Sequence, residues 1–175
     1  MNNETGEIIY YGTLSYGDQV IYTAATEQGL CFVGSPAGGF SELEVWAKTY
    51  RNDSKLVEQA VHVGPYVQQI KEYLNKERTE FDIPVDLKGT DFQESVWAEL
   101  RKIPYGETVS YSDIAERIGR PKAVRAVGRS NGLNPVMIVV PCHRVVSKNG
   151  NLTGFRGGLE MKQILLEIES VKRQV

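Results

Sequence analysis

Short runs of apolar and β-branched residues, separated by turn residues, open the chain. The runs at 8–11 and 20–25 flank a turn cluster at 15–18, and this pattern predicts an antiparallel hairpin. Residues 29–34 form a similar run and predict a third strand. The first 34 residues therefore predict a small β-sheet.

Helical periodicity replaces this pattern further along the chain. Apolar residues at helical spacing predict helices over 40–50 and 56–74. The composition then changes, and Pro84 disfavours helix at the residue before it, so we expect an extended connector. We place the boundary between two subdomains here, at residues 1–88 and 89–175.

The second half begins with helix signals. Residues 90–93 read as a capping box before an amphipathic helix, and Ser110 caps a second helix that ends near residue 118. Gly119 suits a left-handed helix exit, and a third helix is predicted over 121–130, with a proline in its first turn. Two short helices joined by a glycine-containing turn indicate a helix-turn-helix. The predicted fold class is α/β (α+β), with a sheet subdomain followed by a mainly helical one.

The most informative stretch is the apolar run 137–146, which predicts a buried strand. Pro141 must bend or end that strand, and a thiol and an imidazole follow it directly, at Cys142 and His143. A buried cysteine can simply fill a gap in a core. Basic neighbours instead favour the nucleophilic thiolate. A regular strand would place Cys142 and His143 on opposite faces, so contact between them needs the bend or a bridging water.

A carboxylate lies in the last predicted helix, at 159–171. Glu169 follows Leu165 by four residues and so falls on or beside the buried side of that helix. Such a residue can be a charge at the helix edge. A buried carboxylate would need a partner, and a histidine is a natural one.

Composition restricts the class of protein. With 175 residues, 41% hydrophobic and 24% charged, the chain suits one globular domain or two small ones. It has no apolar run of membrane-spanning length and no signal-peptide pattern at its start, so we expect a cytoplasmic protein without membrane contact. Cys31 lies in an apolar strand and reads as core. Because cysteines and histidines are few and scattered, we expect no disulfide, metal or cofactor.

Charge is unevenly distributed. Residues 1–89 hold 7 Lys and Arg against 13 Asp and Glu, a net charge of −6, whereas residues 90–175 hold 13 against 9, a net charge of +4. Between Arg117 and Leu159 there are eight cations and no carboxylate. A charged run is usually a solvated face, but such an excess of positive charge indicates binding to nucleic acid.

The sequence Pro-Cys-His-Arg-Val at 141–145, with several segments on either side of it, resembles a known family, the O6-alkylguanine-DNA alkyltransferases (methylated-DNA protein-cysteine methyltransferases). Residues 141–145 match the active-site motif of that family. The other matching segments are Arg125-Ala126-Val127-Gly128, Asn134-Pro135, Gly154-Phe155-Arg156-Gly157-Gly158-Leu159, Lys162, Leu165-Leu166 and Glu169. The resemblance implies an N-terminal α/β subdomain without catalytic residues and a C-terminal subdomain that holds the site.

The resemblance implies DNA repair by direct reversal of damage. Cys142 would accept the alkyl group of O6-alkylguanine or O4-alkylthymine irreversibly, so that each molecule reacts once. His143 would act as a base through a water, and Glu169 would orient His143. Tyr111 would donate a hydrogen bond to the purine ring and help to rotate the nucleotide out of the helix.

The resemblance also implies contacts with duplex DNA. Arg125 would enter the base stack where the target base has left, and Asn134 would tie the helix-turn-helix to the site. The predicted DNA-contacting residues are Tyr111, Lys122, Arg125, Ala126, Arg129 and Asn134. Val145, Phe155 and Arg156 would line the substrate pocket, where the carbonyls of Cys142 and Val145 accept from the base and the backbone N–H of Arg156 faces O6. We expect a monomer acting on double-stranded DNA.

Two alternatives remain from the sequence. A helix-turn-helix regulator, or a non-enzymatic binder of alkylated DNA, would explain the basic segment but not the Cys142–His143 pair or Glu169. A cysteine hydrolase would explain that pair but not the basic segment. Phe155 and Arg156 depart from the tyrosine and the smaller residue common in the family, which affects the expected rim of the pocket.

Overall fold

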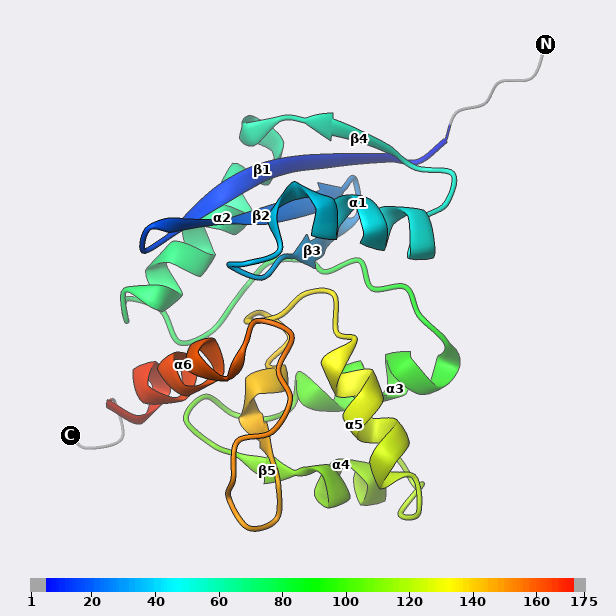
Figure 1. The fold of residues 1–175 in the computed structure, drawn as a ribbon, viewed down its shortest axis with the longest axis vertical. Coiled ribbons are helices and arrows are strands. Elements are labelled where there is room, and N and C mark those ends of the chain that lie inside the picture. Colours follow the sequence, from blue (N-terminus) through cyan, green and yellow to red (C-terminus); the bar gives the residue numbers. More distant parts are fainter. Residues whose placement is uncertain (1–5, 172–175) are drawn as a thin grey trace.

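A computed structural model describes residues 6–171 and shows an N-terminal sheet with two helices above a mainly helical C-terminal half (Figure 1). The N-terminal elements are β1 (Ile8–Tyr16), β2 (Gln19–Thr26), β3 (Gly29–Val33), α1 (Gly39–Tyr50), β4 (Lys55–Glu58) and α2 (Ala60–Leu74). The C-terminal elements are α3 (Asp91–Leu100), β5 (Val109–Ser110), α4 (Tyr111–Arg117), α5 (Val124–Gly132), η1 (Cys142–Arg144), β6 (Val145–Val146) and α6 (Leu159–Val171). The mixed α/β class predicted from the sequence is confirmed.

The sheet has the strand order β3-β2-β1-β4. β1 and β2 form the predicted antiparallel hairpin, with Tyr16 opposite Gln19, and β3 continues the sheet. The predicted helix over 56–74 is wrong in its first residues, because 55–58 form β4, which pairs in parallel with β1. Local helical spacing could not reveal this strand, since its pairing partner lies more than 40 residues away in the sequence.

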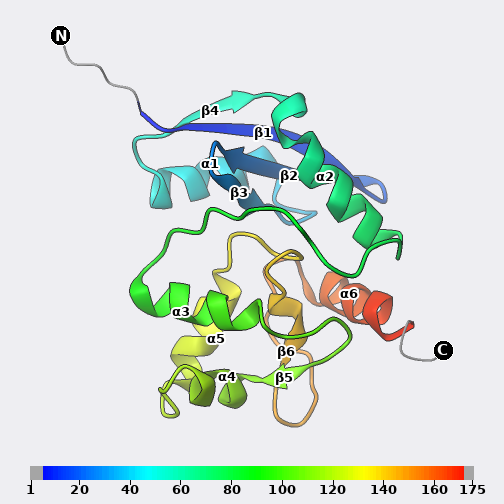
Figure 2. The ribbon, with the colours of Figure 1, turned by 180° about the vertical axis from the view of Figure 1, so that it is seen from behind.

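Helices cover both faces of the sheet, α1 on one and α2 on the other (Figures 1 and 2). The α1 side is a small cluster around Ile9, Phe32 and Leu43, in which Cys31 is fully buried. Burial raises the pKa of Cys31 to about 12, as expected for a core thiol. The α2 side belongs to the same apolar cluster as the core of the C-terminal half, so α2 faces the elements that carry the candidate site.

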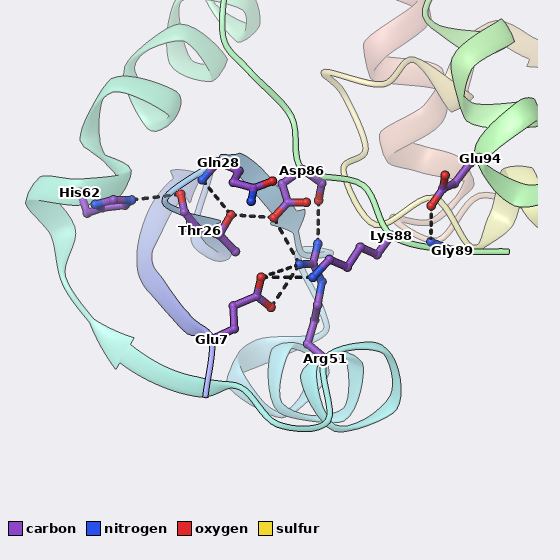
Figure 3. Close-up of polar contacts among 9 residues, drawn as sticks. All are labelled: Glu7, Thr26, Gln28, Arg51, His62, Asp86, Lys88, Gly89 and Glu94. Atoms are coloured by element: carbon purple, nitrogen blue, oxygen red, sulfur yellow. Dashed lines mark hydrogen bonds and ion pairs between the residues drawn. The ribbon is translucent and has the colours of Figure 1, made fainter. Parts of the chain in front are cut away.

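The extended connector is fixed to the sheet. Its backbone pairs with β3, through Leu30 N to Pro84 O at 3.0 Å and Asp86 N to Leu30 O at 2.8 Å. Buried Arg51 donates to the Asp86 carbonyl at 2.8 Å and to its carboxylate at 3.2 Å, and it also donates to Glu7 (Figure 3). Thr26 donates to the same Asp86 carboxylate at 2.6 Å. The connector is thus held by a buried ionic network.

Replacing Asp86 by Asn is expected to lower the free energy of unfolding by about 2–3 kcal/mol, because the largely buried Arg51 then keeps only the partly exposed Glu7 as a charged partner. Burial opposes ionisation of Asp86, but the hydrogen bonds from Thr26 and Arg51 outweigh it and lower the pKa of the carboxyl below 3.8. This contribution is therefore present above pH 3.8 and is lost as the pH falls through the lowered pKa. Urea unfolding of both proteins against pH measures it. An equal loss in the exposed control Asp53→Asn would contradict the account.

The helix-turn-helix forms much as predicted. Capping boxes at Thr90 and Ser110 start α3 and α4, and Gly119 has a φ of +74° at the turn. The predicted start of the next helix is wrong, because residues 121–122 form a turn and α5 begins at Val124. Pro121 therefore lies in the loop between α4 and α5, not in the first turn of α5. The last helix has its predicted bounds.

The predicted strand at 137–146 is wrong for most of its length, although its residues are largely buried. Residues 137–139 form a turn, η1 follows Pro141, and only 145–146 are strand, paired with β5. Ile138 has a φ of +75°, a costly conformation for a β-branched residue. The Asn134 side chain spans this segment, donating to Val140 O at 2.8 Å and accepting from Val136 N at 3.0 Å. The Asn134 side chain and a backbone hydrogen bond from Val140 N to Val136 O at 3.0 Å thus hold a turn in place of the expected strand.

Among residues 6–171, no helix is long and apolar enough to cross a membrane.

Candidate functional site

The bend after Pro141 brings Cys142 and His143 into a single 3-10 turn. The turn is closed by hydrogen bonds from Cys142 N to Val140 O at 2.8 Å and from Arg144 N to Pro141 O at 3.0 Å. Cys142 is 3% exposed and His143 is fully buried. His143 Nε2 lies 2.8 Å from Oε1 of Glu169, which α6 supplies. The structure therefore brings the predicted histidine and carboxylate into direct contact, next to the predicted nucleophile in the chain.

The hydrogen bonds assign the proton of His143. An ionised carboxylate can only accept, so the proton lies on Nε2, and Nδ1 carries the lone pair. Nδ1 is buried and has no hydrogen-bond partner among the described residues. Burial lowers the pKa of His143 despite the opposing charge of Glu169. At neutral pH the ring is a neutral base with an available nitrogen.

Cys142 rests as a thiol. Burial raises its pKa, and the Asn134 side chain and the positive charges of Arg156 and Lys162 reduce that rise without cancelling it. To act as a nucleophile, the thiol would have to lose this proton. A neighbouring neutral imidazole is suited to take that proton.

Glu169 is held by several donors. Arg144 donates to Oε1 through Nη2 at 2.8 Å and to Oε2 through Nε at 3.0 Å, and Gly106 N donates to Oε2 at 3.2 Å. Tyr73, from α2, donates to Oε1 at 2.6 Å. Burial opposes ionisation, but the hydrogen bonds from His143 and Arg144 outweigh it and lower the pKa of Glu169 to about 2. The carboxylate is ionised at every physiological pH.

Two carbonyls predicted to accept from the base are already held in place. Cys142 O accepts from Asn131 Nδ2 at 3.3 Å, and Val145 O accepts from Lys162 Nζ at 2.7 Å. Lys162 is fully buried and also donates to Thr153 O at 3.0 Å. Cys142 O also accepts from the backbone N–H of Val145, so both of its lone pairs are in use and a base would have to share or replace one of these hydrogen bonds.

Tyr111 stands at the start of α4. Its hydroxyl lies 3.0 Å from Thr153 Oγ1, in the loop between β6 and α6. The Tyr111 ring also lies close to the backbone of Gly128 in α5, where a Cβ would approach the ring within 3.7 Å. Tyr111 therefore connects the helix-turn-helix with the loop that continues to Phe155 and Arg156.

Arg156 turns its side chain towards the N-terminal half. The guanidinium pairs with Glu42 of α1, lies 5.3 Å from the ring centroid of Phe32, and donates to Asn134 O at 3.2 Å. Phe155 is half-buried against the core. The Arg156 side chain thus fastens the loop to α1 and to the Asn134 segment, which leaves only its backbone for the predicted contact with a base.

Four of the predicted DNA-contacting residues lie on α5 or in the turn just before it. Lys122, Arg125, Ala126 and Arg129 are all exposed, whereas Val127 and Ser130 of α5 are buried. Trp97 of α3 donates to Ser130 O at 2.8 Å and fixes the buried side. Asn134 follows α5 directly and is almost fully buried. The exposed surface of α5 can meet a polyanion while its other side joins the segment that leads to Cys142.

Sequence reasoning did not predict four contacts of this site. Tyr73 and Arg144 contact Glu169, Asn131 contacts Cys142 O, and Lys162 contacts Val145 O. Arg144 and Lys162 lay within the recognised motifs, but their buried partners could not be deduced from spacing. Tyr73 carried no signal, because it occurs in an apolar helix pattern 70 residues before His143. Among residues 6–171 no cluster of three metal-ligating side chains occurs.

Residues 91–171 match the family described as 6-O-methylguanine DNA methyltransferase, DNA binding domain, and residues 9–87 match its ribonuclease-like domain. The inducible methylated-DNA–protein-cysteine methyltransferase of Bacillus subtilis is 50% identical over 161 residues, 92% of this chain and 90% of that protein. The methylated-DNA–protein-cysteine methyltransferase of Methanosarcina acetivorans is 40% identical over 161 residues, 92% and 98% of the two chains.

Solved structures that resemble this chain belong to proteins of the same kind. The crystal structure of O6-methylguanine methyltransferase from Mycobacterium tuberculosis has a TM-score of 0.80 and 38% identity, covering 93% of both chains. A structure of M. tuberculosis OGT in complex with DNA has a TM-score of 0.78 and 39% identity, covering 93% of this chain and 94% of that one.

Proposed function

Because the chain belongs to the 6-O-methylguanine DNA methyltransferase family, we propose that it repairs alkylated DNA by moving the alkyl group of O6-alkylguanine, or of O4-alkylthymine, onto Cys142. The observation that carries this proposal is a buried array in which Cys142 and His143, on the segment that follows the exposed basic helix α5, meet Glu169 of α6. A nucleophile, a base and a group that orients the base are the parts that such a transfer requires.

In the proposed reaction the sulfur of Cys142 attacks the alkyl carbon. The S–C bond forms as the C–O6 bond breaks, and the electron pair of that bond leaves with guanine. The thiol proton passes through a water to His143 Nδ1, whose lone pair is available, and from there it can reach the leaving base. Tyr111 donates a hydrogen bond to the purine ring and stabilises the developing anion. The product thioether has no easy hydrolytic exit, so each molecule reacts once.

A base inside a duplex cannot reach a buried thiol, so the target nucleotide must leave the stack. We assign Arg125 to the space that it vacates, since the side chain is exposed on α5. Lys122 and Arg129 would contact phosphates on the same surface, and the small side chain of Ala126 would allow close approach. Asn134 links this helix to the Cys142 segment through its hydrogen bond to Val140 O.

We divide the chain into residues 1–88 and 89–175, the second of which carries the nucleophile and the DNA surface. All proposed catalytic residues come from one chain, which supports action as a monomer on double-stranded DNA. We propose that this activity takes place in the cytoplasm and that the protein needs no cofactor for it. Sedimentation of the protein alone and with a short duplex tests the monomer proposal.

The proposal is tested by titrating the protein with a duplex that carries one O6-methylguanine and measuring the methylated base that remains. Loss of methylguanine should stop at one equivalent of protein. Repeated turnover would indicate a cysteine hydrolase instead. Tight binding without any loss of methylguanine would leave a non-enzymatic binder of alkylated DNA, or a regulator, as the better account.

Replacing Arg125 by Ala is expected to slow transfer from duplex DNA by about tenfold or more, because the extruded nucleotide then loses the side chain that fills its place. Transfer from free O6-benzylguanine should change little, since no base has to leave a stack. Single-turnover rates with both substrates measure the difference. Lys71→Ala removes an exposed cation of α2 and serves as the control. Equal loss with duplex and free base would contradict the role given to Arg125.

A further inference from the structure

The hydrogen-bonded group around Glu169 contains one residue from the N-terminal half. Tyr73 lies in the last turns of α2 and is fully buried. Its hydroxyl donates to Glu169 Oε1 at 2.6 Å and lies 3.3 Å from His143 Nε2. In both views of the fold the C-terminal end of α2 lies near α6 (Figures 1 and 2). The tyrosine therefore reaches the catalytic pair directly.

We propose that Tyr73 is a positioning residue of the alkyl-transfer reaction, and that the N-terminal half thereby completes the catalytic group. Its hydroxyl holds Glu169 Oε1 against His143 Nε2. The imidazole ring then keeps the orientation in which Nδ1 can accept the proton that leaves the Cys142 thiol. The inference rests on the proposed function, because it concerns the base of that reaction.

The geometry supports this role in two ways. The three atoms Tyr73 Oη, Glu169 Oε1 and His143 Nε2 lie within 3.3 Å of one another, so the tyrosine contacts both members of the pair. The Tyr73 ring is fixed by Phe81, at 5.4 Å between centroids, and by Tyr105, at 6.1 Å. Burial and the charge of Glu169 raise the pKa of Tyr73, so the hydroxyl keeps its proton and remains a donor.

The hydroxyl also affects the basicity of His143. The charged groups around His143 are Glu169 and Lys162 from α6 and Arg144 from its own turn. Tyr73 is a neutral neighbour, with its ring centroid 6.5 Å from that of His143. A hydrogen bond from Tyr73 offsets part of the negative charge of Glu169 that faces the imidazole. Without it, the carboxylate would hold a proton on His143 more strongly, and the neutral base would persist only at higher pH.

The test is the single-turnover rate of the full-length protein with a duplex carrying one O6-methylguanine, measured from about pH 5 to about pH 9. For Tyr73→Phe we expect transfer at neutral pH to slow by about tenfold and the acidic limb of the profile to move to higher pH. Tyr105→Phe is the matched control. It removes a hydroxyl from the same cluster, but one that donates to Ile168 O at 3.2 Å rather than to Glu169.

A second measurement covers the case in which Tyr73→Phe does not fold. Site-specific 3-fluorotyrosine at position 73 keeps the ring and donates more strongly, so the acidic limb should move to lower pH. The proposal is overturned if the acidic limb stays at its native position in the Phe and fluorotyrosine variants that fold, even when the rate falls, because a merely structural role would change the rate alone. If the native protein itself transfers nothing, the proposed function fails and this inference fails with it.

Discussion

Replacing Cys142 by Ala is expected to abolish alkyl transfer and to leave DNA binding close to that of the native protein. The sulfur is the only proposed acceptor, and among residues 6–171 the other cysteine, Cys31, is fully buried on the α1 side of the sheet. The exposed cations of α5 that face the phosphates are unchanged. Residual transfer should be undetectable, since no neighbouring group can replace a thiolate towards a saturated carbon.

The measurement is the O6-methylguanine left in a duplex after incubation, together with the affinity for the same duplex. Cys31→Ala is the matched control and should transfer at the native rate, with some loss of stability from the core. Transfer that survives in Cys142→Ala would disprove the assignment of the nucleophile. Loss of DNA binding in that variant would show that the thiol is also needed for the structure of the DNA-binding surface on α5.

Replacing Glu169 by Gln is expected to impair both stability and transfer. The carboxylate accepts from His143, Arg144, Tyr73 and Gly106, and an amide nitrogen in place of one oxygen would face donors that it cannot accept from. Breaking a buried charged pair of this kind costs about 3–5 kcal/mol of unfolding free energy. Transfer should slow by about a hundredfold or more, because the orientation and tautomer of His143 are no longer fixed.

The pKa of about 2 for Glu169 gives this prediction a pH dependence. The ordinary pKa of a glutamate is 4.5, so the lowered value contributes stability that is fully present above pH 4.5 and is lost as the pH falls towards 2. The difference corresponds to about 3 kcal/mol. Chemical unfolding between about pH 2 and about pH 7 should show this loss in the native protein and a much smaller one in Glu169→Gln. The exposed Glu167→Gln, on the same helix, should behave as the native protein does.

The sequence predicted the order of most elements, although it missed β4, and it predicted local shape less well. Capping boxes at Thr90 and Ser110 and the glycine at 119 depend on neighbours in the chain, and all three are found. The segment 137–146 was predicted as a strand from its β-branched residues. Its turn depends instead on side-chain hydrogen bonds from Asn134 and on a left-handed Ile138, which hydrophobic patterning cannot show.

The same limit applies to the site. The position of Glu169 on its helix indicated a buried carboxylate that needs a partner, and His143 is that partner. Spacing could not show that Arg144 takes up most of the remaining hydrogen-bonding capacity of the carboxylate. Nor could it show that Tyr73 reaches the pair from the N-terminal half, because this contact exists only once the C-terminal end of α2 meets α6. Partners far apart in sequence were therefore found only in the structure.

The most direct test of the central claim is the intact mass of the protein after incubation with a duplex that carries one O6-methylguanine. We expect a gain of about one methylene (~14 Da), never more than one per molecule, and its location on the peptide that contains Cys142. No gain in mass, or a methyl group found on the Cys31 peptide, would contradict the account.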